Sequence, residues 1–269
     1  MNHHNLPDPN RLSLLVAVIL LSYALARFID LPGRELAVQL PGIYFEINLN
    51  IYTVVAFLVA GLTATGADWL LRQHPSASKH STLEHWLLPS LTSWVIGIPL
   101  FQLPLSPQWW LGFAIGGILL TLVLTAEYIT IDPQDERHPL AAAGLTALSF
   151  ALFLSLAISL RVAGYRLFLI LPALALGVSL ISLRTLHLRL QGRWAVTQAT
   201  AIALTSAQLT AALHYMPLSP ISFGLIVLGP SYAITSLITS LSEHKTLRQA
   251  FIEPLIVLVI VIGAAIWTK

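Results

Sequence analysis

The side chains with the greatest potential for chemistry lie in one short acidic segment. Asp132, Asp135 and Glu136 are followed by His138, so three carboxylates and an imidazole could provide ligands for a divalent cation. Their spacing matches neither a calcium-binding loop nor a zinc motif. Acidic segments of this kind usually form solvated turns and helix caps. We therefore expect a turn here and predict no metal site and no cofactor.

Neutral polar residues inside apolar segments form a second group of candidates. Gln198, Thr205 and Gln208 recur at helical spacing. Two interpretations are open: hydrogen bonds between helices, worth about 1 kcal/mol or less each in a membrane, or a polar seam that binds a substrate. The candidate substrate-binding residues are Gln198, Gln208, Thr92, Ser93, Thr205 and Ser206.

Histidines and charges near the ends of apolar segments have simpler expected roles. His74, His80 and His85 share one connecting segment, and we expect them to be exposed rather than to bind a ligand. Charged side chains at helix ends commonly anchor the chain at the membrane surface. The residues expected to act in this way are Glu127, Arg184 and His187.

Motifs for known reactions are absent. The chain contains no H-E-x-x-H, no G-x-S-x-G, no P-loop and no G-x-G-x-x-G. It has no cysteine, which excludes disulfides, thiolate metal sites and cysteine nucleophiles. The net charge of +2 gives no indication of nucleic-acid binding. No catalytic residue is predicted.

The elements that must position these residues are membrane-spanning helices. Of the 269 residues, 56% are hydrophobic and only 10% are charged, against about 25% charged in a soluble domain. The charges cluster between apolar runs that approach the roughly 20 residues needed to cross a bilayer. Because only helices and closed barrels satisfy the backbone in lipid, and no barrel-like alternation occurs, we predict an all-α membrane protein with about nine spans, a single polytopic domain over residues 1–269. The runs are Leu12–Phe28, Leu49–Leu71, Trp86–Leu103, Gln108–Ala126, Leu140–Leu160, Leu167–Leu183, Ala195–Leu213, Ile221–Leu241 and Leu255–Thr268.

The distribution of Lys and Arg predicts the orientation. With a cytoplasmic N-terminus, nine of the 14 basic residues fall inside and five outside, as the positive-inside rule favours. We therefore predict a bacterial inner-membrane protein with its N-terminus in the cytoplasm. Eight spans in place of nine would move the C-terminus to the other side. Ala24-Leu25-Ala26 resembles a signal-peptidase site, but we expect an uncleaved first helix.

An internal duplication is the most informative pattern. Leu91-Thr92-Ser93, ten residues and Pro104-Leu105-Ser106-Pro107 recur as Leu204-Thr205-Ser206, ten residues and Pro217-Leu218-Ser219-Pro220. The repeat units span about residues 86–126 and 195–241. Four crossings separate them, so the repeat is parallel. A duplicated four-helix unit with one extra helix accounts for nine spans.

A small β-hairpin is expected between the first two helices, over residues 30–48. Ile43, Phe45 and Ile47 alternate with polar residues after Pro41-Gly42, and the orientation places the hairpin outside the cytoplasm. Together with the segment Gly61-Leu62-Thr63-Ala64-Thr65-Gly66-Ala67-Asp68-Trp69-Leu70-Leu71-Arg72, this hairpin resembles a family of bacterial polytopic inner-membrane proteins of unknown function. The resemblance covers about the first third of the chain and implies no activity.

Three functional hypotheses follow. The first is a non-enzymatic structural or accessory subunit, favoured because the middle of every run lacks Asp, Glu, Lys and Arg. The second is a permease or lipid-handling transporter with a site between the duplicated halves. The third is an intramembrane enzyme that uses Glu127, Asp132, Asp135 or His138. The expected partner is the lipid bilayer, with other membrane proteins or a second copy as alternatives, and no nucleic acid.

Overall fold

The computed structural model describes residues 6–29, 34–40, 43–49, 51–76, 83–190, 192–243 and 246–268. The chain divides into two compact units, residues 1–131 (unit 1) and 132–269 (unit 2). Each unit is described by itself below. His80 and the Pro41-Gly42 turn, for which predictions were made, lie outside the described residues.

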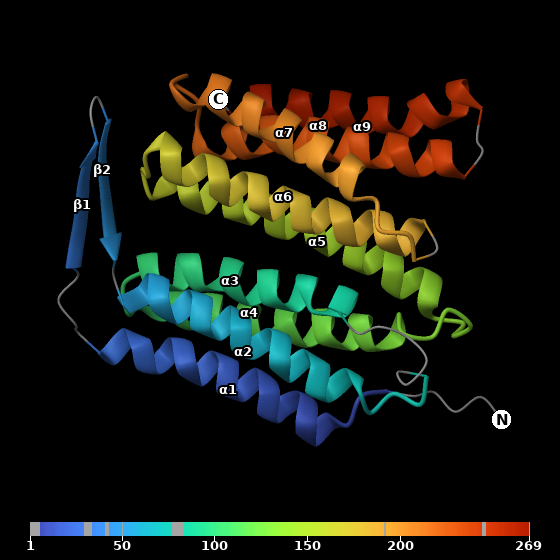
Figure 1. The fold of residues 1–269 in the computed structure, drawn as a ribbon, viewed down its shortest axis with the longest axis horizontal. Coiled ribbons are helices and arrows are strands. Elements are labelled where there is room, and N and C mark those ends of the chain that lie inside the picture. Colours follow the sequence, from blue (N-terminus) through green and yellow to red (C-terminus); the bar gives the residue numbers. More distant parts are fainter. Residues whose placement is uncertain are drawn as a thin grey trace. The chain divides into compact units, whose positions relative to one another are not determined.

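Unit 1 is a bundle of four helices in which consecutive helices run in opposite directions (Figure 1). Helix α1 packs on α2 and α4, α2 packs on α3, and α3 packs on α4. A short 3₁₀ turn, η2, precedes α3. The bounds are α1 Pro9–Phe28, α2 Ile51–Leu71, η2 Leu83–His85, α3 Leu87–Gln102 and α4 Pro107–Ile129.

The core of unit 1 is apolar and closely packed. Tyr23 of α1 donates a hydrogen bond from its hydroxyl to the Ser93 carbonyl at 2.6 Å, and its ring lies against Gly97. The indole N–H of Trp109 donates to the Leu100 carbonyl at 3.0 Å. Each buried polar tip therefore has a backbone acceptor, as burial of Tyr and Trp requires.

Unit 2 contains five helices and repeats the neighbour order of unit 1. Helix α5 packs on α6 and α8, α6 packs on α7, and α7 packs on α8. The fifth helix, α9, packs on α8. The bounds are α5 His138–Val162, α6 Leu167–Arg189, α7 Val196–His214, α8 Pro220–Ser242 and α9 Leu247–Trp267. Helix α9 begins eight residues before the predicted run and so includes Arg248 and Glu253.

Two strands, β1 (Arg34–Leu40) and β2 (Ile43–Leu49), lie between α1 and α2. They pair antiparallel, with Leu36 opposite Ile47 and Val38 opposite Phe45. The register pairs Ile43 with Leu40 in the same way, whereas Leu49 pairs with Arg34. The side of the membrane on which these strands lie stays a prediction.

Seven of the described helices are long and apolar enough to cross a membrane. The prediction of about nine spans is therefore supported only in part, because α3 and α7 fall outside this set. Helix α3 has 16 residues and a length of about 24 Å, less than the roughly 30 Å of a bilayer core. Helix α7 is made less apolar by Gln198, Gln208 and four threonines. Both helices are third in their unit.

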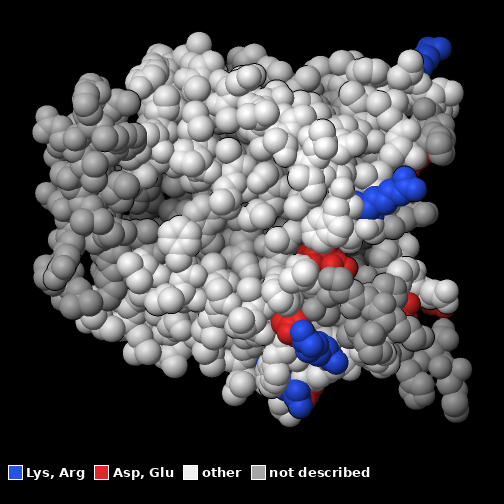
Figure 2. Space-filling view, viewed as in Figure 1, with Lys and Arg blue, Asp and Glu red and all other residues white. Residues whose placement is uncertain are grey.

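Two ion pairs of unit 1 lie at one end of the bundle, whereas Arg27 lies in the last turn of α1 at the other end. Asp8 and Arg11 lie where α1 begins, and Asp68 and Arg72 lie where α2 ends. Figure 2 shows that most of the described surface drawn on this face is uncharged. This arrangement is typical of a bundle whose apolar sides face lipid.

Candidate functional site

The candidate site lies in unit 1, where α3 begins and α4 ends. Consecutive antiparallel helices bring the start of one beside the end of the other. Turn η2 carries His85 just before α3, and Glu127 occupies the last turn of α4. Two ionisable residues 42 positions apart in the sequence therefore meet at the same end of the bundle.

His85 and Glu127 form a direct hydrogen bond. The distance from His85 Nδ1 to Glu127 Oε2 is 2.7 Å, a length typical of a charge-assisted hydrogen bond. When Glu127 is ionised, the Nδ1–H donates to the carboxylate. The side chains are 5% and 0% exposed, so the pair is almost completely removed from solvent and lipid.

Further polar and aromatic groups surround the pair. The Thr130 hydroxyl donates to the Glu127 carbonyl at 3.0 Å and lies 3.4 Å from Oε2. The buried His74 ring packs edge-on against Tyr128, with 4.9 Å between ring centroids. The arrangement can hold and exchange a proton between an imidazole and a carboxylate, which is the chemistry of a proton relay. In the part of the chain that the structure describes, no group of three or more His, Cys, Asp or Glu side chains could hold a metal ion.

Two of these residues, His74 and His85, were predicted to be exposed, and that prediction is wrong, whereas the interfacial position predicted for Glu127 and Arg184 stays a prediction. His74 and His85 are each 4% exposed, Glu127 is 0% exposed and Arg184 of unit 2 is 1% exposed. His74 and His85 lie in a mainly polar segment, and the predicted apolar runs end next to Glu127 and Arg184, so composition indicates a loop or a helix end. Burial comes from tertiary packing of the helix ends, which single-chain periodicity does not encode. The sequence could have indicated this contact. If the runs Trp86–Leu103 and Gln108–Ala126 pack antiparallel, His85 before the first run lies close to Glu127 after the second.

The predicted substrate-binding residues of α3 are buried and already bonded. The Thr92 hydroxyl donates to the Leu88 carbonyl at 2.7 Å, and the Ser93 hydroxyl donates to the Ser90 carbonyl at 2.9 Å. Such bonds to the preceding turn are the usual arrangement in apolar helices. Both hydroxyls therefore have a backbone acceptor within their own helix.

The predicted residues of α7 divide between two faces of that helix. Gln198, Thr205 and Gln208 are exposed, and Thr205 donates to the Ala201 carbonyl at 2.9 Å. Ser206 and Thr210 are buried, and among the described residues their hydroxyls have no hydrogen-bond partner. The glutamines therefore do not share a face with the buried hydroxyls. Substrate binding by the six candidates of both units stays a prediction.

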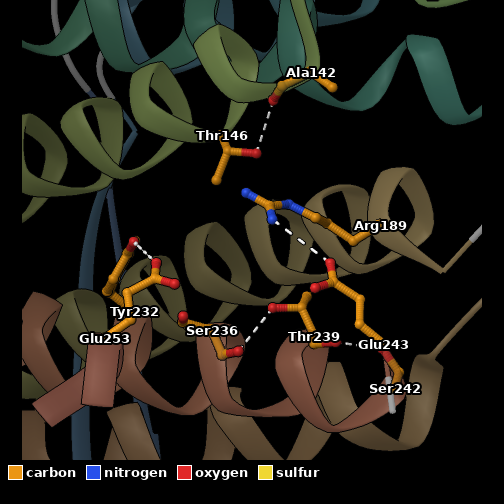
Figure 3. A network of polar contacts seen from close by, with 9 residues as sticks. All are labelled: Ala142, Thr146, Arg189, Tyr232, Ser236, Thr239, Ser242, Glu243 and Glu253. Carbon is orange, nitrogen blue, oxygen red and sulfur yellow. Dashed lines mark hydrogen bonds and ion pairs between the residues drawn. The ribbon is translucent and has the colours of Figure 1, made fainter. Parts of the chain in front are cut away.

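A second polar network lies in unit 2 (Figure 3). Arg189 of α6 approaches Glu243 at 3.9 Å, and the Tyr232 hydroxyl of α8 donates to Glu253 of α9 at 3.1 Å. Both contacts are partly exposed, so each contributes at most about 1 kcal/mol. The first contact joins the ends of α6 and α8, and the second joins the middle of α8 to the second turn of α9.

The acidic segment forms a turn, as predicted. Asp132 Oδ1 accepts a hydrogen bond from the Gln134 N–H at 3.0 Å, and Asp135 Oδ1 accepts one from the Arg137 N–H at 2.8 Å. Each carboxylate thus satisfies the backbone two residues ahead, the usual role of Asp in turns. Helix α5 begins directly afterwards at His138.

Comparison with known proteins places the chain in a family without providing an activity. No curated protein matches the sequence, and no solved structure matches the fold. A family profile matches residues 31–268, which cover most of the chain: all of unit 2 except its last residue, and unit 1 from the segment after α1 onward. The resemblance that the hairpin and the segment around Asp68 suggested is consistent with this result. The chain belongs to the family described as protein of unknown function (DUF5656).

Proposed function

We propose that this chain is a membrane carrier of the permease class, built from two copies of a four-helix unit, with the His85–Glu127 pair as its protonatable element. The observation that carries the proposal is the burial of that pair, at 5% and 0% exposure. Ionisable residues inside a membrane domain are rare and usually mark ion or proton pathways.

Stability alone does not account for such a pair. Removing two charged groups from water costs several kcal/mol each, and apolar residues of similar volume often stabilise a fold equally well or better. Helices α3 and α4 also pack on each other along their length, so the bundle does not depend on this hydrogen bond to join them. Transfer of the proton that His85 and Glu127 share gives a better reason for the presence of the pair.

The internal duplication supports the carrier class, because many transporters contain parallel repeats. In each copy of the Pro-Leu-Ser-Pro motif, the serine is the N-cap and the last proline is the first residue of the next helix. Arg27 Nη2 donates to the Leu103 carbonyl at 3.2 Å. Arg161 Nη2 donates to the Met216 carbonyl at 2.9 Å. Both acceptors directly precede the first proline of the motif.

Burial in the first helix of each unit follows the same pattern. When Arg27 of α1 is aligned with Arg161 of α5, every buried position of α1 coincides with a buried position of α5. Since the paired residues differ in type, the correspondence comes from shared packing. The pairs are Leu15 with Ser149, Val16 with Phe150, Ile19 with Phe153, Tyr23 with Ala157 and Ala26 with Leu160.

An accessory subunit is the second candidate function, and helix α9 favours it. Helix α9 has no counterpart in unit 1, and only 17% of its most apolar window is buried. A photo-reactive amino acid in place of Val259, which is 64% exposed, shows whether α9 contacts another protein or only lipid in native membranes. Discrete protein adducts support an accessory subunit, whereas lipid adducts alone support a lipid-facing helix.

We also propose that the N-terminus is cytoplasmic in a bacterial inner membrane, from the excess of basic residues on that side. In that orientation the end of unit 1 that carries His85 and Glu127 faces the cytoplasm. A reporter fused to each terminus tests this orientation.

The test of the carrier proposal is a pH jump applied to proteoliposomes on a solid-supported membrane. Wild-type protein should give a transient charge displacement, and Glu127→Gln should abolish it while the protein stays folded. Asp68→Asn is the matched control, since it removes a carboxylate from the surface pair with Arg72. Identical currents in wild type and Glu127→Gln would show that the pair is a structural link.

A further inference from the structure

We propose that unit 2 binds ordered water inside its bundle, at the hydroxyl groups of Ser206 and Thr210 on α7. The two residues are four positions apart, so their side chains are neighbours on the same face of the helix. Ser206 is 2% exposed and Thr210 is 0% exposed. Both hydroxyl oxygens are buried, and neither has a hydrogen-bond partner among the described residues. This pair of hydroxyls is the polar wall of the site.

Other hydroxyls of α7 and α8 follow the usual arrangement in apolar helices, in which the side chain bonds to the preceding turn. In α7, Thr200 and Thr205 each donate to such a carbonyl at 2.9 Å. In α8, Ser231 and Thr235 do the same at 2.8 Å. Leaving a buried hydroxyl unpaired is unfavourable and uncommon in folded proteins. A bound molecule that supplies the missing hydrogen bonds explains the conformation of Ser206 and Thr210.

The surroundings favour a small uncharged ligand. Helix α7 carries no Asp, Glu, Lys or Arg, and the sequence contains no Asp or Glu between Glu136 and Glu243. Divalent cations prefer sites with several oxygen ligands, including carboxylates. A hydroxyl can both donate and accept a hydrogen bond. Water has the same capacity and binds inside proteins where buried polar groups lack partners, so it matches the two neighbouring hydroxyls.

Unit 1 has a side chain at the corresponding level. The duplication aligns Ser206 with Ser93 and Thr210 with Gly97. The Tyr23 hydroxyl donates to the Ser93 carbonyl at 2.6 Å, and the Tyr23 ring lies against Gly97. In unit 1 the polar group at this level is therefore the hydroxyl of a phenol.

Unit 2 lacks this phenol. The alignment of α1 with α5 places Ala157 opposite Tyr23. The Thr210 side chain is smaller than the ring that is missing, so unit 2 carries less side-chain volume at this level. Water would supply the hydrogen-bonding group that Tyr23 supplies in unit 1. This comparison depends on the duplication proposed above, whereas the unpaired hydroxyls do not.

The direct test is water-edited solid-state NMR of the full-length protein in lipid bilayers, with labelled threonine methyl groups. Magnetisation from water should reach the Thr210 methyl at short mixing times. The Thr92 methyl is the matched control and should stay dark. Both residues are 0% exposed, but the Thr92 hydroxyl already donates to the Leu88 carbonyl. Transfer to neither methyl, or equal transfer to both, would overturn the proposal.

The stability of Thr210→Val is a second test. If the hydroxyl is bonded to water, Val removes one hydrogen bond and should lower the Tm by about 2–4 °C. If the site is dry, Val removes an unpaired polar group and raises the Tm, which would overturn the proposal. Thr205→Val is the matched control, because Thr205 lies on the exposed face of the same helix, and it should leave the Tm nearly unchanged.

A graft from unit 1 tests where the water lies. Ala157→Tyr alone should lower the Tm, because the added ring would meet the Thr210 side chain. Adding Thr210→Gly rebuilds the arrangement of Tyr23 and Gly97 and should recover most of that loss. A double variant no more stable than Ala157→Tyr would overturn the placement of the water in the space that Tyr23 fills in unit 1. None of these outcomes depends on the His85–Glu127 pair, so they test water binding separately from the carrier proposal.

Discussion

Truncating one partner of the His85–Glu127 pair should destabilise the protein far more than removing both. Glu127→Leu removes the carboxylate partner of an imidazole that is 5% exposed, and His85→Leu removes the imidazole partner of a carboxylate that is 0% exposed. Breaking a buried pair in this way costs about 3–5 kcal/mol in the free energy of unfolding. The double variant removes both desolvated groups, so we expect it to lie within about 1–2 kcal/mol of wild type. The pairwise coupling energy should then be about 3 kcal/mol or more.

The assay is a double-mutant cycle with unfolding measured by steric trapping or forced unfolding in bicelles. The surface pair Asp68–Arg72 is the control. Its atoms lie closer, at 2.6 Å, but its side chains are 19% and 68% exposed, so we expect a coupling of only about 0.3–0.5 kcal/mol. A His85–Glu127 coupling as small as that of the surface pair would refute the inference that the pair is sealed from water.

Three further predictions concern packing and the end of unit 2. Gly97→Ala should lower the free energy of unfolding by about 1–3 kcal/mol, because its Cβ would lie 2.7 Å from Cε1 of Tyr23, whereas Gly61→Ala has open space and should be neutral or stabilising; thermal unfolding of both variants checks this. Arg161→Gln should increase proteolysis at the turn after α7, because it removes the donor to two carbonyls there; unchanged cleavage would contradict this role. Burial, with the nearby Arg161 charge, lowers the pKa of His214 below its usual 6.5. The neutral form is therefore favoured by folding, so stability is fully present above about pH 6.5 and declines as pH falls through the folded pKa; His214→Gln should reduce this acid-side fall in Tm.

The sequence predicted the helices well and their burial poorly. Apolar runs identify helices because every backbone group must be bonded within lipid, and the proline motifs at Pro107 and Pro220 mark two helix starts that the structure contains. The runs also predicted spans at α3 and α7, which length or neutral polar residues leave outside the set of seven helices that are long and apolar enough to cross. Boundaries also shifted at α9, whose charged first turns belong to the helix.

The candidate site was not accessible to the same reasoning. His85 was predicted to be exposed because it follows a polar segment, and Glu127 was predicted to lie at the interface. Their contact depends on how two helix ends pack, which periodicity does not specify. Conversely, Gln198 and Gln208 were chosen for their spacing, but α7 places them on its exposed face. Helical spacing predicts that residues share a face and does not predict which face is buried.

The most direct test of the carrier proposal uses the absence of native cysteine. Thr92→Cys places one thiol in the buried core of unit 1, and Arg72→Cys places one at its charged end as the control. Labelling with a membrane-impermeant maleimide from each side of oriented vesicles, at two pH values, reports when the core opens. A carrier predicts that the Thr92→Cys thiol becomes reactive from opposite sides at the two pH values, and that Glu127→Gln removes this change. A thiol that stays unreactive from both sides at either pH, while Arg72→Cys labels normally, would contradict the account and leave His85–Glu127 as a structural link.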